Sequence, residues 1–485
     1  MKLSELLHGI DSLDFCADLT AEITGVSYDS RQTKPGDLFV AMEGYETDGH
    51  KFIPMALEKG AACVLCQQAQ PAGVPYVRTS DSRAALAQVG RNWYGDPAAS
   101  MTLIGVTGTN GKTTTTYLLK DVLEQAAKAK VGLIGTNQNM IGPEILPTER
   151  TTPESFELQG LFRRMADAGC THVVMEVSSH ALYLQRVAGV RFAVGIFTNL
   201  TQDHLDFHGT MENYCDAKAL LFRQCGAGVY NADDPWADRI IAGADCRCTS
   251  IGEHSADLTA RNIRLDAEGV SFDAVSGGEI VPIHVGIPGG FMVYNVLGVL
   301  AAAKALGISL ADSAQVLRRS PHVKGRVEVV PTPWDYTVLI DYAHTPDALE
   351  NVLTAARGFA AGRVVVLFGC GGDRDRTKRP QMGAIAARLA DFVVVTSDNP
   401  RTEPPHAIIA DIVDGMVGTE TPYVVVEDRI AAIRYAMDHA QAGDVVILAG
   451  KGHETYQVVG REKHHLDERE VVADCIRAIQ QKERA

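Results

Sequence analysis

Short apolar runs alternate with amphipathic stretches through the middle of the chain. The runs "MTLIGVTG", "AKVGLIG", "THVVMEV" and "VGIFTNL" have the length of buried strands, whereas "SFELQGLFRRMADAG" repeats its apolar residues at helical spacing. Strands that alternate with helices in this way usually pair in parallel, because each helix carries the chain back across the sheet. The pattern predicts a parallel sheet with helices on both faces over residues 99–325.

The same alternation begins again after "PHVKGRVEVV". Its strands are "YTVLIDYA", "RVVVLFG", "DFVVVTS" and "DVVILAG", and helical patterns such as "LENVLTAARGFA" and "MGAIAARLA" separate them. Near the start, "DLFVAM" and "AACVL" indicate strands, and the turn-rich "YGDPAAS" closes that part of the chain. We therefore predict an α/β protein of three domains: a small N-terminal α/β domain (1–98), a central parallel-sheet domain (99–325) and a C-terminal Rossmann-like domain (326–485).

Composition narrows the class of protein. The 485 residues are 46% hydrophobic and 22% charged, and the formal net charge of −15 argues against a general nucleic-acid binder. We find no signal-peptide pattern and no run of 18 apolar residues, so we expect a cytoplasmic protein that does not insert into a membrane. The ten cysteines include one CxxC, at Cys63 and Cys66, without a second pair at zinc-ligand spacing, so reduced thiols are expected.

A glycine-containing loop follows the first strand of the middle segment. "VTGTNGKTTTT" spans residues 106–116 and leads into a helical pattern, so its backbone N–H groups could cradle phosphates. Lys112 would neutralise the outer phosphates and the Thr113 hydroxyl would hold Mg²⁺. The usual first glycine of such loops falls on Val106, and this chain offers Gly108 and Gly111 instead. The alternative is a glycine-rich helix entry without a ligand; the pattern favours an ATP-type nucleotide and a P-loop ATPase domain, with kinase, ATPase and ligase chemistry open.

Acidic and imidazole side chains follow two later strands. Glu176 ends "VVMEV", and "FTNLTQDHLDFHG" adds Asp203, His204, Asp206 and His208. Each alone is more often an ordinary solvated or core residue, but strand ends of a parallel sheet meet at the edge where open α/β folds bind ligands. Mg²⁺ in nucleotide sites takes one or two protein ligands, for which Glu176 and His204 would suit. A nearby lysine, Lys218 of "NYCDAKALLF", suits cations only as an anionic carbamate formed with CO₂.

The stretch "SDNPRTEPP" follows a buried strand of the last segment. Asn-Pro favours a turn, so Arg401 could be a solvated arginine at a strand-end turn or a reader of a charged ligand. A guanidinium matches a carboxylate with two parallel hydrogen bonds. The residues alone leave both readings open.

Nine motifs in one order carry a resemblance to a known family. They are "GTNGKTT", "MEVSSHAL", "FTNLTQDHLDFHG", "DAKALLF", "GRVE", "DYAHTPDAL", "GCGGDRDRTKRP", "DNPR" and "AGKGHE". Together with "DSRQTKPGDLFVAMEGYETDGHKFI" near the N-terminus, they resemble the Mur ligases of bacterial peptidoglycan synthesis over nearly the whole chain. The resemblance implies an ATP-dependent ligase that adds meso-diaminopimelate to UDP-N-acetylmuramoyl-L-alanyl-D-glutamate through an acyl phosphate.

The resemblance also implies roles for residues of the nucleotide and metal sites. The implied catalytic residues are Lys112, Lys218 and His204. The implied ATP-binding residues are Gly108, Thr109, Asn110, Gly111, Lys112, Thr113, Thr114, Asn295, Arg326 and Asp341. The implied Mg²⁺ ligands are Thr113, Glu176, His204 and Lys218 as its carbamate. Without the resemblance, Arg326 and Asp341 would more simply be an exposed ion pair.

Further implied contacts belong to the two other substrates. The residues implied to contact the UDP-linked substrate are Tyr28, Ser30, Tyr45, Glu46, Thr47, Thr151, Thr152, Ser178 and Arg186. Thr151 and Thr152 could instead be an ordinary N-cap before "PESFELQG". Leu184 stands two residues before Arg186, where some relatives carry a glutamine. Those to diaminopimelate are Arg374, Asp398, Asn399, Pro400, Arg401, Gly450 and Glu454, with the arginines reading its distal carboxylate.

Three competing functions follow from the same residues. A lysine-adding ligase of the same family has no use for Arg401, because lysine lacks the distal carboxylate. A folylpolyglutamate synthetase shares the ligase core but not the uridine-type N-terminal segment. A P-loop ATPase that forms no bond would hydrolyse ATP without an amino acid. We expect a monomer that uses ATP, Mg²⁺ and CO₂.

Overall fold

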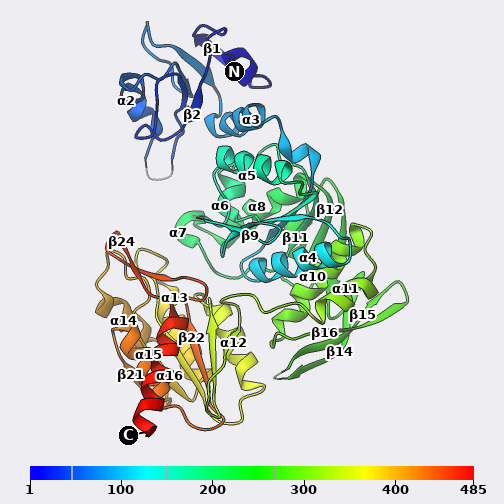
Figure 1. Ribbon diagram of the computed structural model, residues 1–485, viewed down its shortest axis with the longest axis vertical. Coiled ribbons are helices and arrows are strands. Elements are labelled where there is room, and N and C mark those ends of the chain that lie inside the picture. The colour runs from blue at the N-terminus through cyan, green and yellow to red at the C-terminus, as the bar shows by residue number, and fades with distance from the viewer. Residues whose placement is uncertain (45–46, 149, 267, 485) are drawn as a thin grey trace. The chain divides into compact units, whose positions relative to one another are not determined.

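The computed structural model describes residues 1–44, 47–148, 150–266 and 268–484 (Figure 1). Its residues form two compact units. The first unit contains Met1–Gly105, Ala129–Ala193 and Leu220–Gly226, and the second contains Val106–Lys128, Val194–Ala219 and Ala227–Ala485. No helix in the described ranges is both long and apolar enough to cross a membrane.

The N-terminal part of the first unit is a small sheet with helices. Its strands are β1 (Ser12–Cys16), β2 (Gly25–Ser27), β3 (Asp37–Val40), β4 (Cys63–Cys66) and β5 (Tyr76–Thr79), in the order β1-β5-β4-β3-β2. Its helices are α1 (Leu3–Leu6), α2 (Ile53–Glu58) and α3 (Ser82–Tyr94). Only β1 runs antiparallel to its neighbour. Both cysteines of the CxxC lie buried on β4, and all ten cysteines are free thiols.

The remainder of the first unit surrounds the start of β6 (Thr102–Thr107). The strand order there is β6-β10-β7-β8-β9, with β7 (Val131–Ile134), β8 (Asn139–Ile141), β9 (Glu144–Leu146) and β10 (His172–Glu176). Its helices are α5 (Ser155–Asp167) and α6 (Ser179–Tyr183). β10 pairs in parallel with β7, whereas β8 and β9 form an antiparallel extension.

The second unit continues from the end of β6. Its strand order is β16-β15-β14-β13-β12-β11-β6, with β11 (Phe192–Phe197), β12 (Cys225–Asn231), β13 (Arg247–Gly252), β14 (Leu258–Asp266), β15 (Gly269–Ser276) and β16 (Glu279–Val285). Its helices are α4 (Lys112–Gln125), α7 (Leu205–His208), α8 (Met211–Ala219), α9 (Ala237–Ile241), α10 (Phe291–Ala305) and α11 (Leu310–Leu317). Helix α10 is apolar on nearly every side, as expected of a helix enclosed by protein.

A separate sheet of the second unit carries the C-terminal strands. The order is β17-β18-β22-β19-β20-β21, with β17 (Glu328–Val330), β18 (Thr337–Asp341), β19 (Val364–Phe368), β20 (Phe392–Val395), β21 (Tyr423–Val425) and β22 (Val445–Ala449). β23 (Tyr456–Val459) and β24 (Glu462–His465) form a hairpin. The helices are α12 (Pro346–Arg357), α13 (Lys378–Leu389), α14 (Pro405–Asp414), α15 (Arg429–Asp438) and α16 (Glu468–Arg484).

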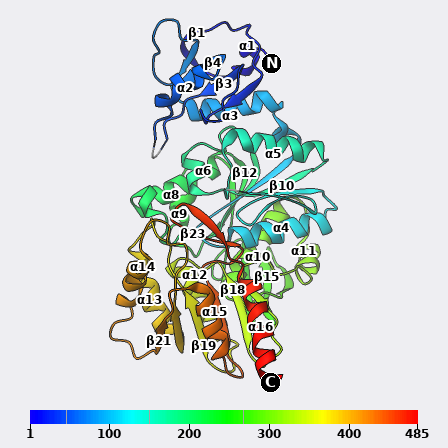
Figure 2. The ribbon, with the colours of Figure 1, turned by 60° about the vertical axis from the view of Figure 1, so that its left-hand side comes forward.

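Helices α15 and α16 lie side by side on this sheet (Figures 1 and 2). Their apolar residues, such as Ile433 and Val472, join Ile340, Leu367 and Leu448 of the strands in one buried cluster. Because β18, β22, β19 and β20 are parallel, their carboxyl ends share one edge of the sheet. The loops that follow β19, β20 and β22 carry the residues predicted to bind the amino acid.

The α/β class predicted from the sequence is confirmed, and every strand and helix predicted by its pattern is present. The structure differs in its antiparallel strands: β14, β15 and β16 form a meander that strand–helix alternation did not predict. They belong to one sheet with the parallel strands β12 and β13, so the sheet is mixed. The predicted boundaries at residues 98 and 325 stay a prediction.

Candidate functional site

The phosphate loop lies between the end of β6 and the start of α4. Gly108 and Gly111 have φ of +148° and +84°, and a Cβ on Gly111 would lie 2.2 Å from Oδ1 of Asn295. Glycine is therefore required at 111, both for its backbone and for the close approach of Asn295. The Lys112 ammonium donates to the carbonyls of Gly108 and Thr109 at 2.9 and 2.8 Å. The loop thus lies against Asn295, another residue predicted to contact ATP, at a helix N-terminus suited to phosphates.

Arg326 contacts this loop, and Asp341 is bonded to the backbone of the residue after Arg326. Nη2 of Arg326 donates to the Thr113 hydroxyl at 2.9 Å, and the guanidinium lies 4.7 Å above the Tyr342 ring. Asp341 is buried and accepts the N–H groups of Val327 and Ala343 at 2.7 and 2.8 Å. Burial raises the pKa of its carboxyl. This burial does not fit the alternative of an exposed ion pair.

Lys218 is an almost fully buried amine on α8. Its Nζ donates to the Gly108 carbonyl at 2.8 Å and lies 4.4 Å above the Tyr214 ring. Burial, together with the charge of Lys112, holds the pKa of Lys218 well below its usual value. CO₂ reacts with neutral amines, so the environment of this side chain favours the carbamate chemistry expected from the sequence.

His204 is the N-cap residue of α7 and has an unusual backbone conformation. Its φ is +53°, which histidine rarely adopts, and its Nε2 lies 3.3 Å from the Asp203 carboxylate. Although burial acts in the opposite direction, His204, Lys378 and His344 hold the pKa of Asp203 below its usual value. Asp206 and His208 lie on the same short helix. Within the described ranges, no three His, Cys, Asp or Glu side chains group to hold a metal, so the predicted metal roles stay predictions.

Glu176 lies in the first unit, at the end of β10. Its carboxylate accepts the N–H and the hydroxyl of Thr136 at 2.9 and 2.8 Å, and its own carbonyl accepts the Thr152 hydroxyl at 2.8 Å. Ser178, two residues further, donates its N–H to the same Thr152 hydroxyl at 3.1 Å. Thr151 contacts Thr136 through its hydroxyl at 3.0 Å. The strand end therefore gathers three residues predicted to contact the UDP-linked substrate.

The alternative role of Thr151 and Thr152 as a helix N-cap is wrong. Helix α5 begins at Ser155, and Glu154 is its N-cap. Glu154 also accepts the Nε of Arg186 at 3.2 Å, while Nη1 of Arg186 donates to the Thr152 carbonyl at 3.3 Å. Burial lowers the pKa of the Arg186 guanidinium. Arg186 thus lies beside the predicted threonine pair.

The remaining predicted contacts of the UDP-linked substrate belong to the N-terminal sheet. Tyr28 donates its hydroxyl to Glu157 at 2.5 Å, and the Ser30 hydroxyl lies 3.4 Å from the sulfur of Met55. Thr47 is exposed, and its carbonyl accepts the Gly44 N–H at 3.0 Å. Tyr45 and Glu46 lie outside the described residues.

Asp398, Asn399 and Glu454 come together around a side chain that the motifs did not single out. The Lys451 ammonium is fully buried and lies 3.0 Å from Asp398 and 3.1 Å from Glu454. It donates to Oδ1 of Asn399 at 2.6 Å, and the Asn399 amide donates to Glu454 at 3.0 Å. The signal was present in "AGKGHE", whose lysine follows a strand end. Although burial opposes it, Lys451 keeps the pKa of Asp398 below its usual value.

Arg401 is half-buried and turned toward the loop after β19. Its Nη1 donates to the Gly372 carbonyl at 2.8 Å, and its φ is +51°. A Cβ on Gly371 would lie 2.9 Å from Nη1 of Arg401 and 3.8 Å from Cγ of Arg374, so the two arginine side chains share this region. Burial, and next the charge of Arg374, lower the pKa of Arg401. The N–H of Gly450 donates a hydrogen bond to the Asp341 carbonyl at 3.0 Å. Pro400 is buried and its carbonyl lies against Gly372. Arg401 is thus not the solvated arginine of the alternative reading.

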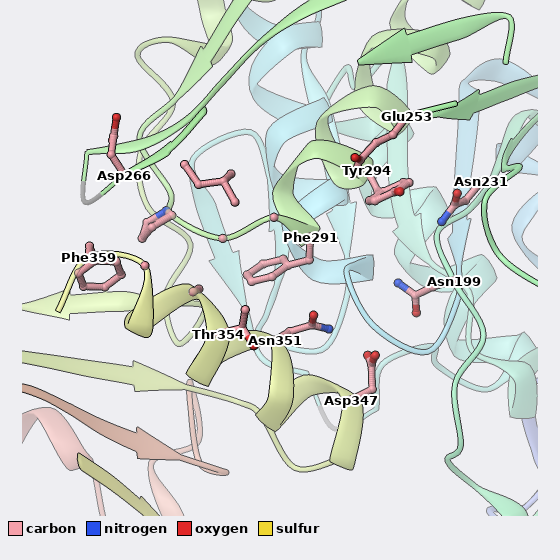
Figure 3. Close-up of a pocket in the computed structure, with 16 residues that line it drawn as sticks. Asn199, Asn231, Glu253, Asp266, Phe291, Tyr294, Asp347, Asn351, Thr354 and Phe359 are labelled. Carbon is pink, nitrogen blue, oxygen red and sulfur yellow. The ribbon is translucent and has the colours of Figure 1, made fainter. Parts of the chain in front are cut away.

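A further pocket of about 380 Å³ adjoins the phosphate loop and contains no residue predicted to bind a substrate. Figure 3 shows Phe291 and Tyr294 on one side and Asp347, Asn351 and Thr354 of α12 on the other. Asp347 connects the pocket to the loop, because Asn110 donates to its carboxylate at 2.6 Å. Burial raises the pKa of Asp347. The lining residues come from several segments that are far apart in sequence, so no local motif could have indicated the pocket.

Three family models identify the class of protein to which this chain belongs. The family model for the Mur ligase middle domain matches residues 106–303, that for the Mur ligase glutamate ligase domain matches 325–452, and that for the Mur ligase family catalytic domain matches 22–94. This chain belongs to the Mur ligase family, and so to a family of ligases.

Several relatives that are 44–47% identical over nearly the full length share one name. The UDP-N-acetylmuramoyl-L-alanyl-D-glutamate–2,6-diaminopimelate ligase of Clostridium botulinum is 46% identical, covering 99% of this chain and 100% of its own. Ligase 1 of the same name from Clostridium acetobutylicum is 47% identical, and the match covers 99% of this chain and 100% of the relative. A solved structure of a ligase of that name is 32% identical with a TM-score of 0.70, covering 99% of each chain. MurF ligase from Thermotoga maritima, solved in complex with ADP, shares the fold at 19% identity and a TM-score of 0.63, over 97% and 100%.

Proposed function

We propose that this protein is an ATP-dependent ligase that adds meso-diaminopimelate to UDP-N-acetylmuramoyl-L-alanyl-D-glutamate during synthesis of peptidoglycan precursors. The observation that carries this proposal is the full-length identity of 46% to a relative that bears this name. The pair of guanidiniums at Arg374 and Arg401 supports the choice of amino acid, since diaminopimelate has a distal carboxylate and lysine does not.

The reaction has two balanced steps. The terminal carboxylate of the UDP-linked dipeptide attacks the γ-phosphorus of ATP, and ADP leaves as the acyl phosphate forms. The amine of diaminopimelate then attacks the acyl carbon, the tetrahedral intermediate expels phosphate, and the nitrogen loses a proton. Neither step needs a protein nucleophile; both need charge neutralisation and alignment.

Residues of the second unit would bind the nucleotide. The backbone N–H groups of the phosphate loop would cradle the phosphates, and Lys112 would turn from the carbonyls of Gly108 and Thr109 to the γ-phosphate. Arg326, which already reaches Thr113, would neutralise the charge that develops during phosphoryl transfer. Asn295 and Asp341 would position the rest of the nucleotide.

We propose Mg²⁺ and a carbamate as the remaining parts of this site. When bound, Mg²⁺ supplies charge neutralisation at the phosphate oxygens. Thr113 and His204 of the second unit would hold it together with the carbamate of Lys218, and Glu176 stays a ligand predicted from the resemblance. The buried and weakly basic Lys218 fits the carbamate, because its amine has lost the hydration that stabilises an ammonium.

The other two substrates would use the sequence-predicted residues. The UDP-linked dipeptide would contact Thr151, Thr152, Ser178 and Arg186 of the first unit, with its uridine on the N-terminal sheet. Diaminopimelate would place its distal carboxylate on Arg374 and Arg401. Glu454 and the Gly450 carbonyl would receive its distal ammonium. The three predicted domains would then serve as a UDP-substrate domain (1–98), an ATP domain (99–325) and an amino-acid domain (326–485).

An amino-acid panel tests the proposal directly. Purified protein with ATP, Mg²⁺ and the UDP-linked dipeptide is given meso-diaminopimelate, lysine or no amino acid, and phosphate release is measured. Release that requires diaminopimelate is expected. Equal release with lysine would indicate a lysine-adding ligase, and full release without an amino acid would indicate an ATPase that forms no bond.

We also propose that the protein acts as a monomer in the cytoplasm, because one chain carries every residue of the proposed sites and ATP is its co-substrate. Light scattering of the purified protein at assay concentrations tests the first point, and a mass of two chains would contradict it.

A further inference from the structure

Two segments with different proposed tasks lie directly against each other in the second unit. Residues 325–328 form the linker segment, which carries Arg326. Residues 450–454 form the amino-acid loop, which carries Glu454. A Cβ on Gly325 would lie 2.2 Å from the His453 nitrogen, so the two backbones are in contact.

One side chain bridges the two segments. Nε and Nη2 of Arg469 donate to the two carboxylate oxygens of Glu328 in the linker segment, at 2.9 and 2.5 Å. The same Nη2 donates to the Gly452 carbonyl of the amino-acid loop at 3.1 Å. Glu328 in turn accepts the Gly325 N–H at 2.6 Å. One guanidinium therefore holds both ends of the linker segment to the loop.

Arg469 is held in place by the buried residues at the start of helix α16. Arg469 lies in the first turn of α16, where its neighbour Glu468 is fully buried and pairs with the equally buried Arg429 at 2.8 Å. Arg429 also donates to the Ala449 carbonyl at the end of β22. Burial acts against ionisation of Glu328, yet Arg469 and the Gly325 N–H keep its pKa below the usual value. The ion pair is therefore fully charged at neutral pH.

The conformation of the linker segment directs the Arg326 side chain toward the phosphate loop. Arg326 is flanked by two residues with left-handed backbone, Gly325 at +69° and Val327 at +46°. In this conformation its guanidinium donates to the Thr113 hydroxyl. A displacement of the amino-acid loop that carries Gly452 with it would pull on Glu328 through Arg469 and so change the direction of Arg326.

We propose that Arg469 is a positioning residue that couples the amino-acid site to the nucleotide site, by fixing the linker segment against the amino-acid loop. Arg469 itself touches neither substrate in this assignment. The inference rests on the proposed function for the identity of the two ligands. The bridge itself rests only on the hydrogen bonds of Arg469. A coupling of this kind is reciprocal: each ligand strengthens the binding of the other by the same factor.

The test measures ADP binding by calorimetry, in full-length protein with Mg²⁺, with and without meso-diaminopimelate and the UDP-linked dipeptide. Arg469→Gln is expected to weaken ADP binding roughly fivefold to tenfold and to abolish the effect of the amino acid on it. Arg469→Lys keeps the positive charge but cannot form the two parallel hydrogen bonds of a guanidinium. It should therefore recover part of the ADP affinity and part of the effect of the amino acid on that affinity. Arg477→Gln is the matched control, because Arg477 lies on the same helix, is exposed and pairs only locally with Asp474.

Three outcomes are informative. Unchanged ADP affinity in Arg469→Gln overturns the inference. Weaker binding of ADP and of the UDP-linked dipeptide by the same factor, with a lower unfolding temperature, also overturns it, because that pattern indicates general destabilisation. If wild-type protein releases no phosphate with diaminopimelate, the proposed function fails, while the ADP affinities of the variants still decide whether Arg469 fixes the linker segment.

A double-mutant cycle adds a readout that a merely structural role would not change. Glu328→Gln removes the partner of the same contact, so the double variant should bind ADP no more weakly than Arg469→Gln alone. Additive losses would show that Arg469 acts on ADP binding by another route and would overturn the inference.

Discussion

Replacing Arg401 with alanine removes the guanidinium proposed to select diaminopimelate. The backbone of Arg401 would stay in place, since its N–H bonds to the Val458 carbonyl and its carbonyl accepts the Gly460 N–H, both independent of the side chain. The change also removes the hydrogen bond to the Gly372 carbonyl at 2.8 Å. Arg374 would remain as one fork for the distal carboxylate. The perturbation is therefore confined to the amino-acid site.

The expected size follows from the lost contact. A charge-assisted pair of hydrogen bonds contributes about 2–3 kcal/mol, and each 1.36 kcal/mol is a factor of ten. The KM for diaminopimelate should therefore rise roughly 30- to 150-fold, because the bidentate bond contributes about 2–3 kcal/mol to binding. The KM for ATP and that for the UDP-linked dipeptide should not change. Lysine has no distal carboxylate, so its KM should not rise.

The assay is phosphate release at saturating ATP and UDP-linked dipeptide, with diaminopimelate or lysine varied. Arg401→Lys separates charge from geometry, since an ammonium cannot make the parallel pair of bonds. Arg388→Ala is a control for loss of an arginine in the same sheet domain, because Arg388 is exposed and pairs with Glu350. An unchanged KM for diaminopimelate, or equal increases for both amino acids, would refute the role of Arg401.

Further expectations concern three other side chains. Lys218→Ala should abolish phosphate release, and small carboxylates such as acetate should restore part of it; an unmodified Lys218 in the mass spectrum of active protein would contradict the carbamate. Lys451→Met should cost about 3–5 kcal/mol of stability, because Asp398 and Glu454 lose their buried partner; an unchanged urea midpoint would argue against this. Burial, and then nearby cations, lower the pKa of His453 to about 3, so the unfolded chain binds a proton that the folded chain does not. The free energy of unfolding should therefore fall as pH decreases from about 6.5 toward 3. His453→Gln should flatten this dependence in thermal melts, and an equally steep loss would exclude His453 as its cause.

Much of the fold could be predicted because its signals are local. The run before Gly108 and the helix after Gly111 are visible in the apolar pattern, and so are the C-terminal strands. The meander β14–β16 was not predicted, since its antiparallel pairing depends on which neighbour each strand meets. Periodicity reports which face of an element is buried but not its partner.

The site was predicted unevenly for the same reason. Motifs indicated Arg401, Glu454 and Lys218, because each stands in a short stretch, "DNPR", "AGKGHE" or "DAKALLF", that resembles the family. Lys451 was missed, since a lysine between two glycines looks like an ordinary loop residue until its burial and its three partners are known. The pocket in Figure 3 was missed because residues from several distant segments line it.

The sequence by itself determined the α/β class, the phosphate loop and the family, because each is carried by residues close together in the chain. Only the tertiary structure decided how charges are paired and how far they are buried. Arg401 is half-buried beside Arg374, and the amine of Lys218 is surrounded by protein. Arg469 bonds to Glu328, from which it is separated by 141 residues in the sequence. The energy of a charge depends on its partners and on the water around it, and neither is a property of the local sequence.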